Sequence, residues 1–189
     1  MRILMLGNSF TYYHDMPKLL AYMTGAEVVA HTRGGAFLEE HLNLTEELGA
    51  KTLPALQNEK WDYVILQEHS KGPAMRREEF QRSAAELCKL IRENGATPVF
   101  YATWAYQEGS EKLASVPYTY AEMEEALTDS YRHAAEVNNA LIAYVGQGFT
   151  ALRDIVNMYE PDAFHPSEAG SMLAASTLAA VINAHAKEA

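Results

Sequence analysis

Three residues from opposite ends of the chain have side chains that nucleophilic catalysis uses. Ser9 follows Gly7 and Asn8 at the end of a short apolar run, and the glycine would let a strand bend into a helix. Asp162 and His165 are spaced i, i+3, so the carboxylate could hold one tautomer of the imidazole while the other ring nitrogen takes a proton. The simpler interpretation is that Asn8 and Ser9 cap a helix. The Asp/His pair lies in a turn directly before a helical pattern. Neither residue belongs to the apolar face of that helix, so packing of the helix does not explain them.

Other candidate residues also follow apolar runs. Gly34 and Gly35 have two interpretations. They form a turn, or the lack of a side chain lets a backbone N–H face the site. Gln67 either bonds a neighbouring loop or presents its amide NH2 group to an oxyanion. His69 comes two residues later and is the other histidine that we expect closest to the same site.

Aromatic side chains and two loops are candidates for the walls of a substrate pocket. Trp104 and Tyr106 would either line an acyl or sugar pocket or cover the core. Residues 106–118 form the longest polar loop, which we interpret as a lid or pocket wall. A second loop, at residues 71–73, is expected over the same edge.

Five short apolar runs alternate with helical patterns. The runs are nearly continuous in apolar residues, as strands covered on both faces are, and they span residues 3–6, 27–30, 63–66, 98–102 and 141–145. The helical patterns cover residues 17–23, 77–93, about 119–134 and about 167–184, and the Glu-rich stretches 39–47 and 122–125 are expected to be solvated helix faces. Thr119 and Glu122 fit a capping box.

This alternation predicts the fold class. We expect one α/β domain over residues 1–189, a three-layer α/β/α sandwich with a flavodoxin-like parallel sheet of strand order 2-1-3-4-5. Ligands in such folds bind beyond the carboxyl ends of the strands. The residues that follow the apolar runs, together with the turn before the last helix, should therefore converge on one edge.

Composition excludes several classes of function. The formal net charge is −10 and no long basic run occurs, which disfavours nucleic acid as a partner. No apolar run approaches the roughly 20 residues of a membrane span, and no signal peptide is visible, so we expect a cytoplasmic protein with no membrane partner. Cys88 is the only cysteine, and the seven histidines fit no metal-binding motif, so we expect no metal. The oligomeric state stays open, a homo-oligomer included.

Together these motifs resemble the SGNH (GDSL-type) hydrolases, a family of serine esterases and lipases. Gly7-Asn8-Ser9-Phe10 resembles the first block of the family, and Gly34-Gly35 resembles the second. Leu66-Gln67-Glu68 occupies the place of the third block, Gly-x-Asn-Asp, and Asp162-Ala163-Phe164-His165 matches the last, Asp-x-x-His. Two departures stand out: the first block has Asn8 in place of Asp, and the third has Gln67 in place of Asn.

The resemblance implies an enzyme that acts on carboxylic esters through an acyl-enzyme intermediate. Ser9 would be the nucleophile, His165 the base and Asp162 the acid that orients it. The Ser9 and Gly35 N–H groups, with the Gln67 amide, would form the oxyanion hole, and no cofactor is implied. The sequence leaves open which of Gly34 and Gly35 donates, and whether Gln67 completes the hole.

The substrate expected from this resemblance is a small acyl ester, such as an acetyl ester on a carbohydrate. Two other functions fit the same fold. One is binding of a phosphate or flavin, although the bulky residues 10–13 and the absence of a Walker lysine speak against it. The other is a carbohydrate-binding relative without catalytic activity.

Overall fold

All five strands form one parallel sheet in a computed structural model that describes residues 1–188. The strands are β1 (Arg2–Gly7), β2 (Glu27–Thr32), β3 (Tyr63–Leu66), β4 (Thr97–Ala102) and β5 (Leu141–Tyr144). Their order is β2-β1-β3-β4-β5, and every neighbouring pair is parallel. The predicted strand order and α/β class are therefore confirmed.

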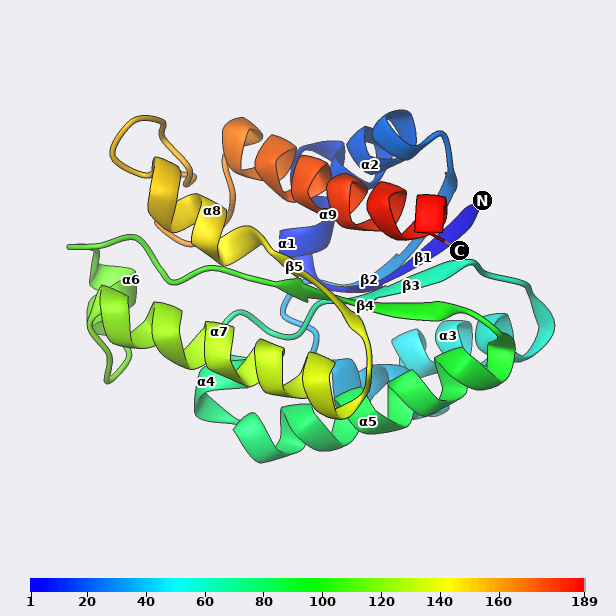
Figure 1. Cartoon of the computed structure of the whole chain (residues 1–189). Helices are drawn as coiled ribbons and strands as arrows, with labels where there is room; N and C mark the ends of the chain where they lie inside the picture. The colour runs from blue at the N-terminus through cyan, green and yellow to red at the C-terminus, as the bar shows by residue number, and fades with distance from the viewer. Residues whose placement is uncertain (189) are drawn as a thin grey trace.

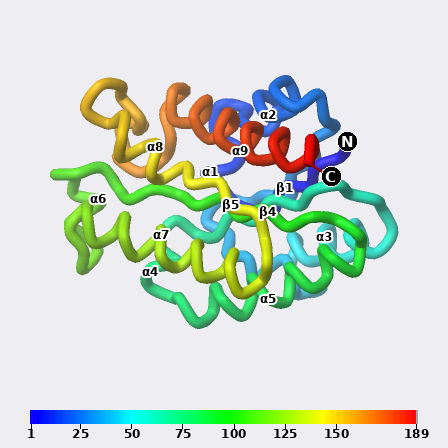
Figure 2. The backbone as a smooth tube through the Cα atoms, in the orientation of Figure 1, coloured from blue at the N-terminus to red at the C-terminus, as the bar shows by residue number. Residues whose placement is uncertain are grey.

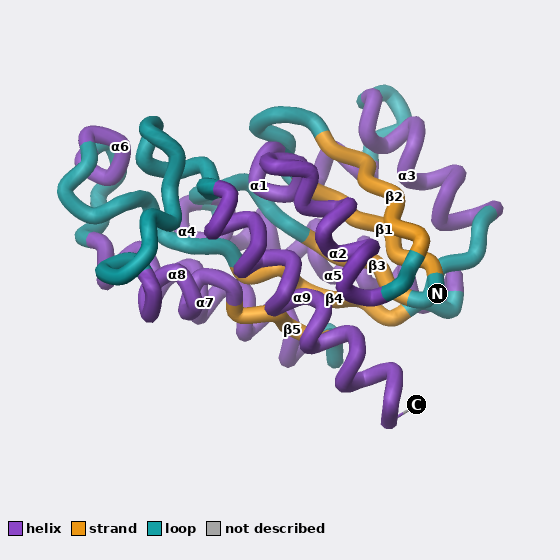
Figure 3. Tube along the Cα trace, turned by 90° about the horizontal axis from the view of Figure 1, so that it is seen from above, coloured by secondary structure: helices purple, strands orange, loops and turns teal. Residues whose placement is uncertain are grey.

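Helices cover both faces of the sheet, as Figure 1 shows. The α-helices are α1 (Ser9–Tyr12), α2 (Met16–Thr24), α3 (Glu47–Asn58), α4 (Gly72–Met75), α5 (Arg77–Asn94), α6 (Glu111–Ala114), α7 (Tyr120–Val137), α8 (Val145–Leu152) and α9 (Glu168–Glu188). The described residues also form two 3-10 helices, η1 (Tyr13–Asp15) and η2 (Leu38–Leu42). One layer contains α1, α2, α8 and α9, and the other contains α3, α4, α5 and α7. Seen from above in Figure 3, the strands lie side by side between these layers.

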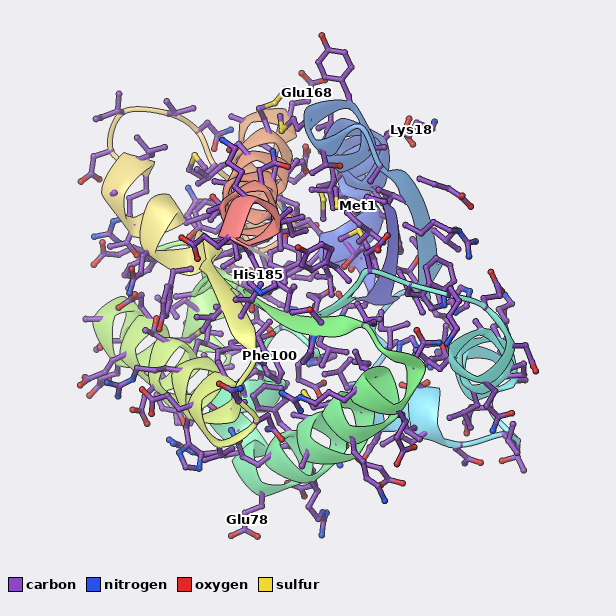
Figure 4. All side chains as sticks on the ribbon, turned by 45° about the vertical axis from the view of Figure 1, so that its right-hand side comes forward. Met1, Lys18, Glu78, Phe100, Glu168 and His185 are labelled. Carbon is purple, nitrogen blue, oxygen red and sulfur yellow. The ribbon has the colours of Figure 1, made fainter. Side chains whose placement is uncertain are left out.

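The core is divided into two parts by the alternation of side chains along each strand. On β1, Ile3 and Met5 pack with residues of α2, α8 and α9, whereas Leu4 and Leu6 pack with residues of α3, α5 and α7. In Figure 4, Phe100 of β4 lies on the side of the sheet that α5 and α7 cover, and Glu78 projects from the surface of α5. This two-sided burial is why the runs are apolar without alternation.

The predicted helices agree with the structure except around residues 39–47. The capping box is confirmed, since the Thr119 side chain accepts from Glu122 N–H and the Glu122 carboxylate accepts from Thr119 N–H. The stretch 39–47 is not one helix face, because the η2 helix ends at Leu42 and α3 begins at Glu47. The helices α3, α4, α6 and α8 were not predicted, and residues 72–73 of the expected loop 71–73 are the start of α4.

The connections beyond the strands' carboxyl ends gather at one end of the molecule. In Figures 1 and 2, α6 and the α8–α9 connection lie at this end, and both termini lie at the other. The predicted polar loop 106–118 contains α6, whose Leu113 packs with Met123 and Leu127 of α7. Among the described residues, no helix is long and apolar enough to cross a membrane. The expected location stays a prediction.

Candidate active site

Ser9 is placed at the carboxyl end of β1 by a turn that Asn8 holds. The Asn8 side chain accepts a hydrogen bond from Phe10 N–H at 3.1 Å and donates one to the Ala36 carbonyl at 3.0 Å. Asn8 therefore caps α1 and ties it to the loop after β2. Ser9 is the first residue of α1, and its hydroxyl takes no part in the cap.

Ser9, His165 and Asp162 form a continuous chain of hydrogen bonds. The Ser9 Oγ lies 2.8 Å from Nε2 of His165, and Nδ1 of the same ring lies 2.6 Å from Oδ2 of Asp162. The other oxygen of Asp162 accepts from the N–H groups of Phe164 and His165, at 3.1 and 3.0 Å. One carboxylate thus shapes the turn and orients the ring within it.

The electrostatics of Asp162 suit this arrangement. Partial burial opposes its ionisation, but hydrogen bonds from the His165 side chain and from two backbone N–H groups outweigh that effect and lower its pKa. The carboxylate is therefore charged at neutral pH. A charged acceptor on Nδ1 keeps the proton at that nitrogen and leaves Nε2 able to accept from Ser9.

A second device holds the imidazole, and sequence reasoning missed it. The ring of Tyr13 stacks on that of His165, with centroids 4.2 Å apart and planes 3° from parallel. Tyr13 leads into His14 and Asp15, which have left-handed backbone angles (φ 50° and 52°). His14 then contacts Glu160 at 2.8 Å, which joins this turn to the segment that carries His165. Backbone strain beside a reactive group is typical of functional sites.

The Gln67 amide supports the turn at Ser9 and does not point into a pocket. Its oxygen accepts from Asn8 N–H and from the Thr11 hydroxyl, both at 2.9 Å, and its NH2 group donates to the Glu68 carbonyl. The predicted oxyanion contact from Gln67 is therefore corrected to a positioning contact. Gly7 is needed for space rather than for bending, because a Cβ there would lie 2.6 Å from the Gln67 side-chain oxygen.

Backbone N–H groups in the pocket wall remain available for an oxyanion. The N–H groups of Ser9 and Gly35 have no hydrogen-bond acceptor within residues 1–188, and both residues line the pocket described below. Gly35 has a φ of 70° in a turn that the N–H of Ala36 closes onto the Arg33 carbonyl at 3.1 Å, a conformation that favours glycine. Gly34 also lines the pocket, and its N–H likewise has no acceptor within the described residues. The assignment of Gly35 as a donor stays a prediction.

A pocket of about 400 Å³ opens over Ser9 and His165. Its other lining residues come from α1, η1, the loops after β2, β3 and β4, α6 and the last turn: Asn8, Phe10, Tyr12, Tyr13, Gly34, Gly35, His69, Ser70, Lys71, Tyr106, Lys112, Ser115 and Phe164. His69 stacks on Phe37 with centroids 4.4 Å apart, and the Tyr106 hydroxyl bonds the Ser70 hydroxyl at 2.8 Å. The structure therefore places His69, Tyr106 and part of loop 106–118 in the pocket wall, as expected.

Trp104 does not line this pocket, contrary to the prediction. Its side chain is fully buried between Phe10 and Phe149, with ring centroids 4.5 and 3.9 Å away. Its indole N–H donates to the Phe164 carbonyl at 3.0 Å, directly before His165 in the chain. The alternative interpretation, core cover, is correct, and the residue anchors the segment that carries the imidazole.

Glu68 is a buried carboxyl behind the pocket wall that joins two loops. It accepts from the N–H groups of His69 at 2.5 Å and Leu38 at 3.3 Å. Burial raises its pKa from 4.5 to about 7, against the lowering effect of those two hydrogen bonds. In the third-block motif it occupies the place of Asp, which was the only signal for it.

The raised pKa predicts a pH dependence of stability. Between pH 4.5 and about 7 the folded protein retains a proton at Glu68 that the unfolded chain has released, so this group makes the free energy of unfolding fall as pH rises through that window. We expect Glu68→Gln to remove this fall. Urea unfolding of both proteins at several pH values from 4.5 to 7.5 measures it, and parallel curves for the two proteins would contradict the prediction.

Comparing the two proteins is necessary because His41 acts in the opposite direction. Burial lowers the pKa of His41 from 6.5 to about 3, so its contribution to stability is lost as pH falls from 6.5 toward 3. This contribution is common to wild type and Glu68→Gln. It therefore cancels in their difference.

Comparison with solved structures identifies the class of protein. The chain is 44% identical to a protein from Slackia heliotrinireducens described as a candidate SGNH hydrolase, with a TM-score of 0.93, and the match covers 96% of this chain and 98% of that one. The chain belongs to the SGNH hydrolase family, as its motifs predicted. It is a hydrolase of the class that contains esterases and lipases.

More distant structures share the fold. A DUF4886 family protein from Bacteroides uniformis is 22% identical with a TM-score of 0.75, covering 97% of this chain and 83% of its own. An acetylxylan esterase from Geobacillus stearothermophilus is 17% identical with a TM-score of 0.68, covering 96% and 93%. No family model and no curated protein sequence matches the chain.

Proposed function

We propose that this protein is a serine esterase that hydrolyses small acyl esters, acetyl esters of carbohydrates among them, through an acyl-enzyme intermediate. The observation that carries the proposal is the chain of hydrogen bonds from Ser9 through His165 to Asp162, with contacts of 2.8 and 2.6 Å. Its open end, the Ser9 hydroxyl, lies in the wall of the pocket.

Each residue then has a defined step. His165 Nε2 takes the Ser9 proton as Oγ attacks the ester carbonyl, and Asp162 stabilises the imidazolium. The tetrahedral oxyanion accepts hydrogen bonds from the N–H groups of Ser9 and Gly35. The imidazolium returns the proton to the departing alcohol and leaves an acyl group on Ser9. Water, deprotonated by the same ring, then attacks the acyl carbon and releases the acid and the free serine.

The size of the pocket and one structural relative support small acyl groups. About 400 Å³ is near the lower end of the range for ligand pockets, and aromatic rings and short loops form its walls. The acetylxylan esterase with this fold makes acetylated carbohydrates the first substrate class to test. We therefore expect hydrolysis of 4-nitrophenyl esters to be fastest for acetate and to decline as the acyl chain lengthens.

Covalent trapping tests the nucleophile directly. We expect a fluorophosphonate to add one phosphonyl group per chain, because the activated Ser9 Oγ attacks phosphorus and expels fluoride. Peptide mass spectrometry should place that group on Ser9, and 4-nitrophenyl acetate added beforehand should slow labelling. Labelling of a different residue, or no labelling of a folded protein, would contradict the proposal and would favour the phosphate-binding or carbohydrate-binding alternatives.

A further inference from the structure

The charges that line the pocket have the opposite sign to the protein as a whole. The chain carries 25 acidic and 15 basic residues, a formal net charge of −10. Apart from histidines, however, the charged side chains in the pocket lining are Lys71 and Lys112, and no Asp or Glu is among the lining residues. A positive pocket in an acidic protein concentrates electric field lines and attracts anions locally.

Lys112 is held in place without being neutralised. Its Nζ lies 4.1 Å from the ring centroid of Phe164 and 5.4 Å from that of Tyr106, within the range of cation–π contacts. Both aromatic residues line the pocket. Aromatic faces attract an ammonium group but carry no net charge, so the positive charge of Lys112 remains available to a ligand.

Neither lysine has an acidic partner in the structure. Within residues 1–188, no carboxylate lies within 4.0 Å of Nζ of Lys71 or Lys112. Two arginines close to the same loops are different, since Arg33 pairs with Glu40 and Arg76 pairs with Glu39. The two arginines beside the pocket are therefore paired with carboxylates, whereas the two lysines that line the pocket are not.

The neutral state of His69 is consistent with this positive field. Burial first, and then the charges of Lys71, Lys112 and Arg76, lower the pKa of the His69 imidazole. Lys71 and Lys112, from separate loops, therefore act on one ring in the pocket wall. The location of the positive charge therefore rests on the lining of the pocket, where both lysines lie beside this ring.

We propose that Lys71 and Lys112 bind an anionic group, such as a carboxylate, on the ester substrate, so that the protein prefers anionic esters to neutral esters of the same shape. This inference rests on the proposed esterase function and specifies its substrate class. Charge-assisted hydrogen bonds from an ammonium group to a carboxylate are stronger than neutral ones and supply the preference.

Two pairs of substrates test the inference and locate the charge. 4-Acetoxybenzoate and 4-acetoxybenzamide differ by a charge on the alcohol side of the ester. Mono-4-nitrophenyl succinate and 4-nitrophenyl butyrate differ by a charge on the acyl side. After correction for the uncatalysed rates, we expect kcat/KM to be at least about tenfold higher for the anionic member of one pair, and the preference to shrink as salt rises from about 0.05 M to 0.5 M.

Lysine variants connect the preference to the pocket. In Lys112→Met the side chain keeps an unbranched apolar stem as far as Cε but loses the ammonium group and its charge. We expect Lys112→Met and Lys71→Met each to lower kcat/KM for the anionic ester more than for its neutral partner, which reduces the preference to about threefold or less. Lys89→Met, on the exposed surface of α5, changes the net charge equally and should leave the preference intact.

A binding measurement keeps this inference separate from the proposed function. Calorimetry with Ser9→Ala compares 4-acetamidobenzoate with 4-acetamidobenzamide, and succinamate with butyramide, so it needs no turnover. Tighter binding of the anion in one pair, lost in Ser9→Ala/Lys112→Met, supports the inference even if no ester is hydrolysed. Equal binding within both pairs, or equal kcat/KM values with no effect of the lysine variants, would overturn it and leave the esterase proposal standing.

Discussion

Ser9→Ala is expected to lower kcat/KM for 4-nitrophenyl acetate by at least about 10³-fold, to the level of the background reaction. Ser9 Oγ is the hydroxyl that lies 2.8 Å from Nε2 of His165, so no other group receives this activation. The substitution removes one oxygen from a side chain that takes no part in the cap of α1. The melting temperature should therefore stay close to that of wild type.

Ser70→Ala is the matched control. Ser70 contributes a hydroxyl to the same pocket, but its Oγ bonds the hydroxyl of Tyr106 instead of a histidine. We expect Ser70→Ala to lose less than about tenfold in kcat/KM. Equal turnover by wild type and Ser9→Ala would remove Ser9 as the nucleophile.

His165→Ala is expected to reduce kcat by at least about 10³-fold, because a nucleophile, its base and the acid that orients the base act as a unit. Without the imidazole, the Ser9 proton has no acceptor and the Asp162 carboxylate has no ring to orient. The effect should appear in kcat more than in KM, since the ring assists proton transfer in the transition state. Stopped-flow measurement of nitrophenol release separates acylation from deacylation, and both should be slowed.

His69→Ala is the control for this experiment. His69 lines the same pocket, but its ring stacks on Phe37 and makes no hydrogen bond to Ser9 within the described residues. We expect a loss of less than about tenfold, in contrast to His165→Ala. A loss of only a few fold for His165→Ala, together with a large loss for His69→Ala, would show that His69 is the base.

The sequence alone determined the α/β class, the order of the strands and the ends of the strands where chemistry could occur. Strands that are buried on both faces require continuous apolar runs, and such runs can be recognised from neighbouring residues alone. A parallel sheet then brings the carboxyl ends of these strands to one edge. The helix α8 was missed because its local pattern does not indicate a helix. Gly146 and Gly148 weaken its local helix signal, and packing needs the first, since a Cβ on Gly146 would lie 2.3 Å from the Thr103 carbonyl oxygen.

Only the tertiary structure decided where the side chains at that edge point. Gln67 turns toward the chain after β1 because the register of β1 and β3 brings its amide beside Asn8 N–H, a contact between residues 59 positions apart. Trp104 is buried because Phe10 and Phe149, from distant segments, close over its two faces. Tyr13 stacks on His165, a residue 152 positions further along the chain, and no local propensity indicates this contact or the left-handed backbone at His14 beside it. Side-chain direction at the end of a strand depends on neighbours distant in sequence, whereas strand and helix patterns depend on neighbours close in sequence.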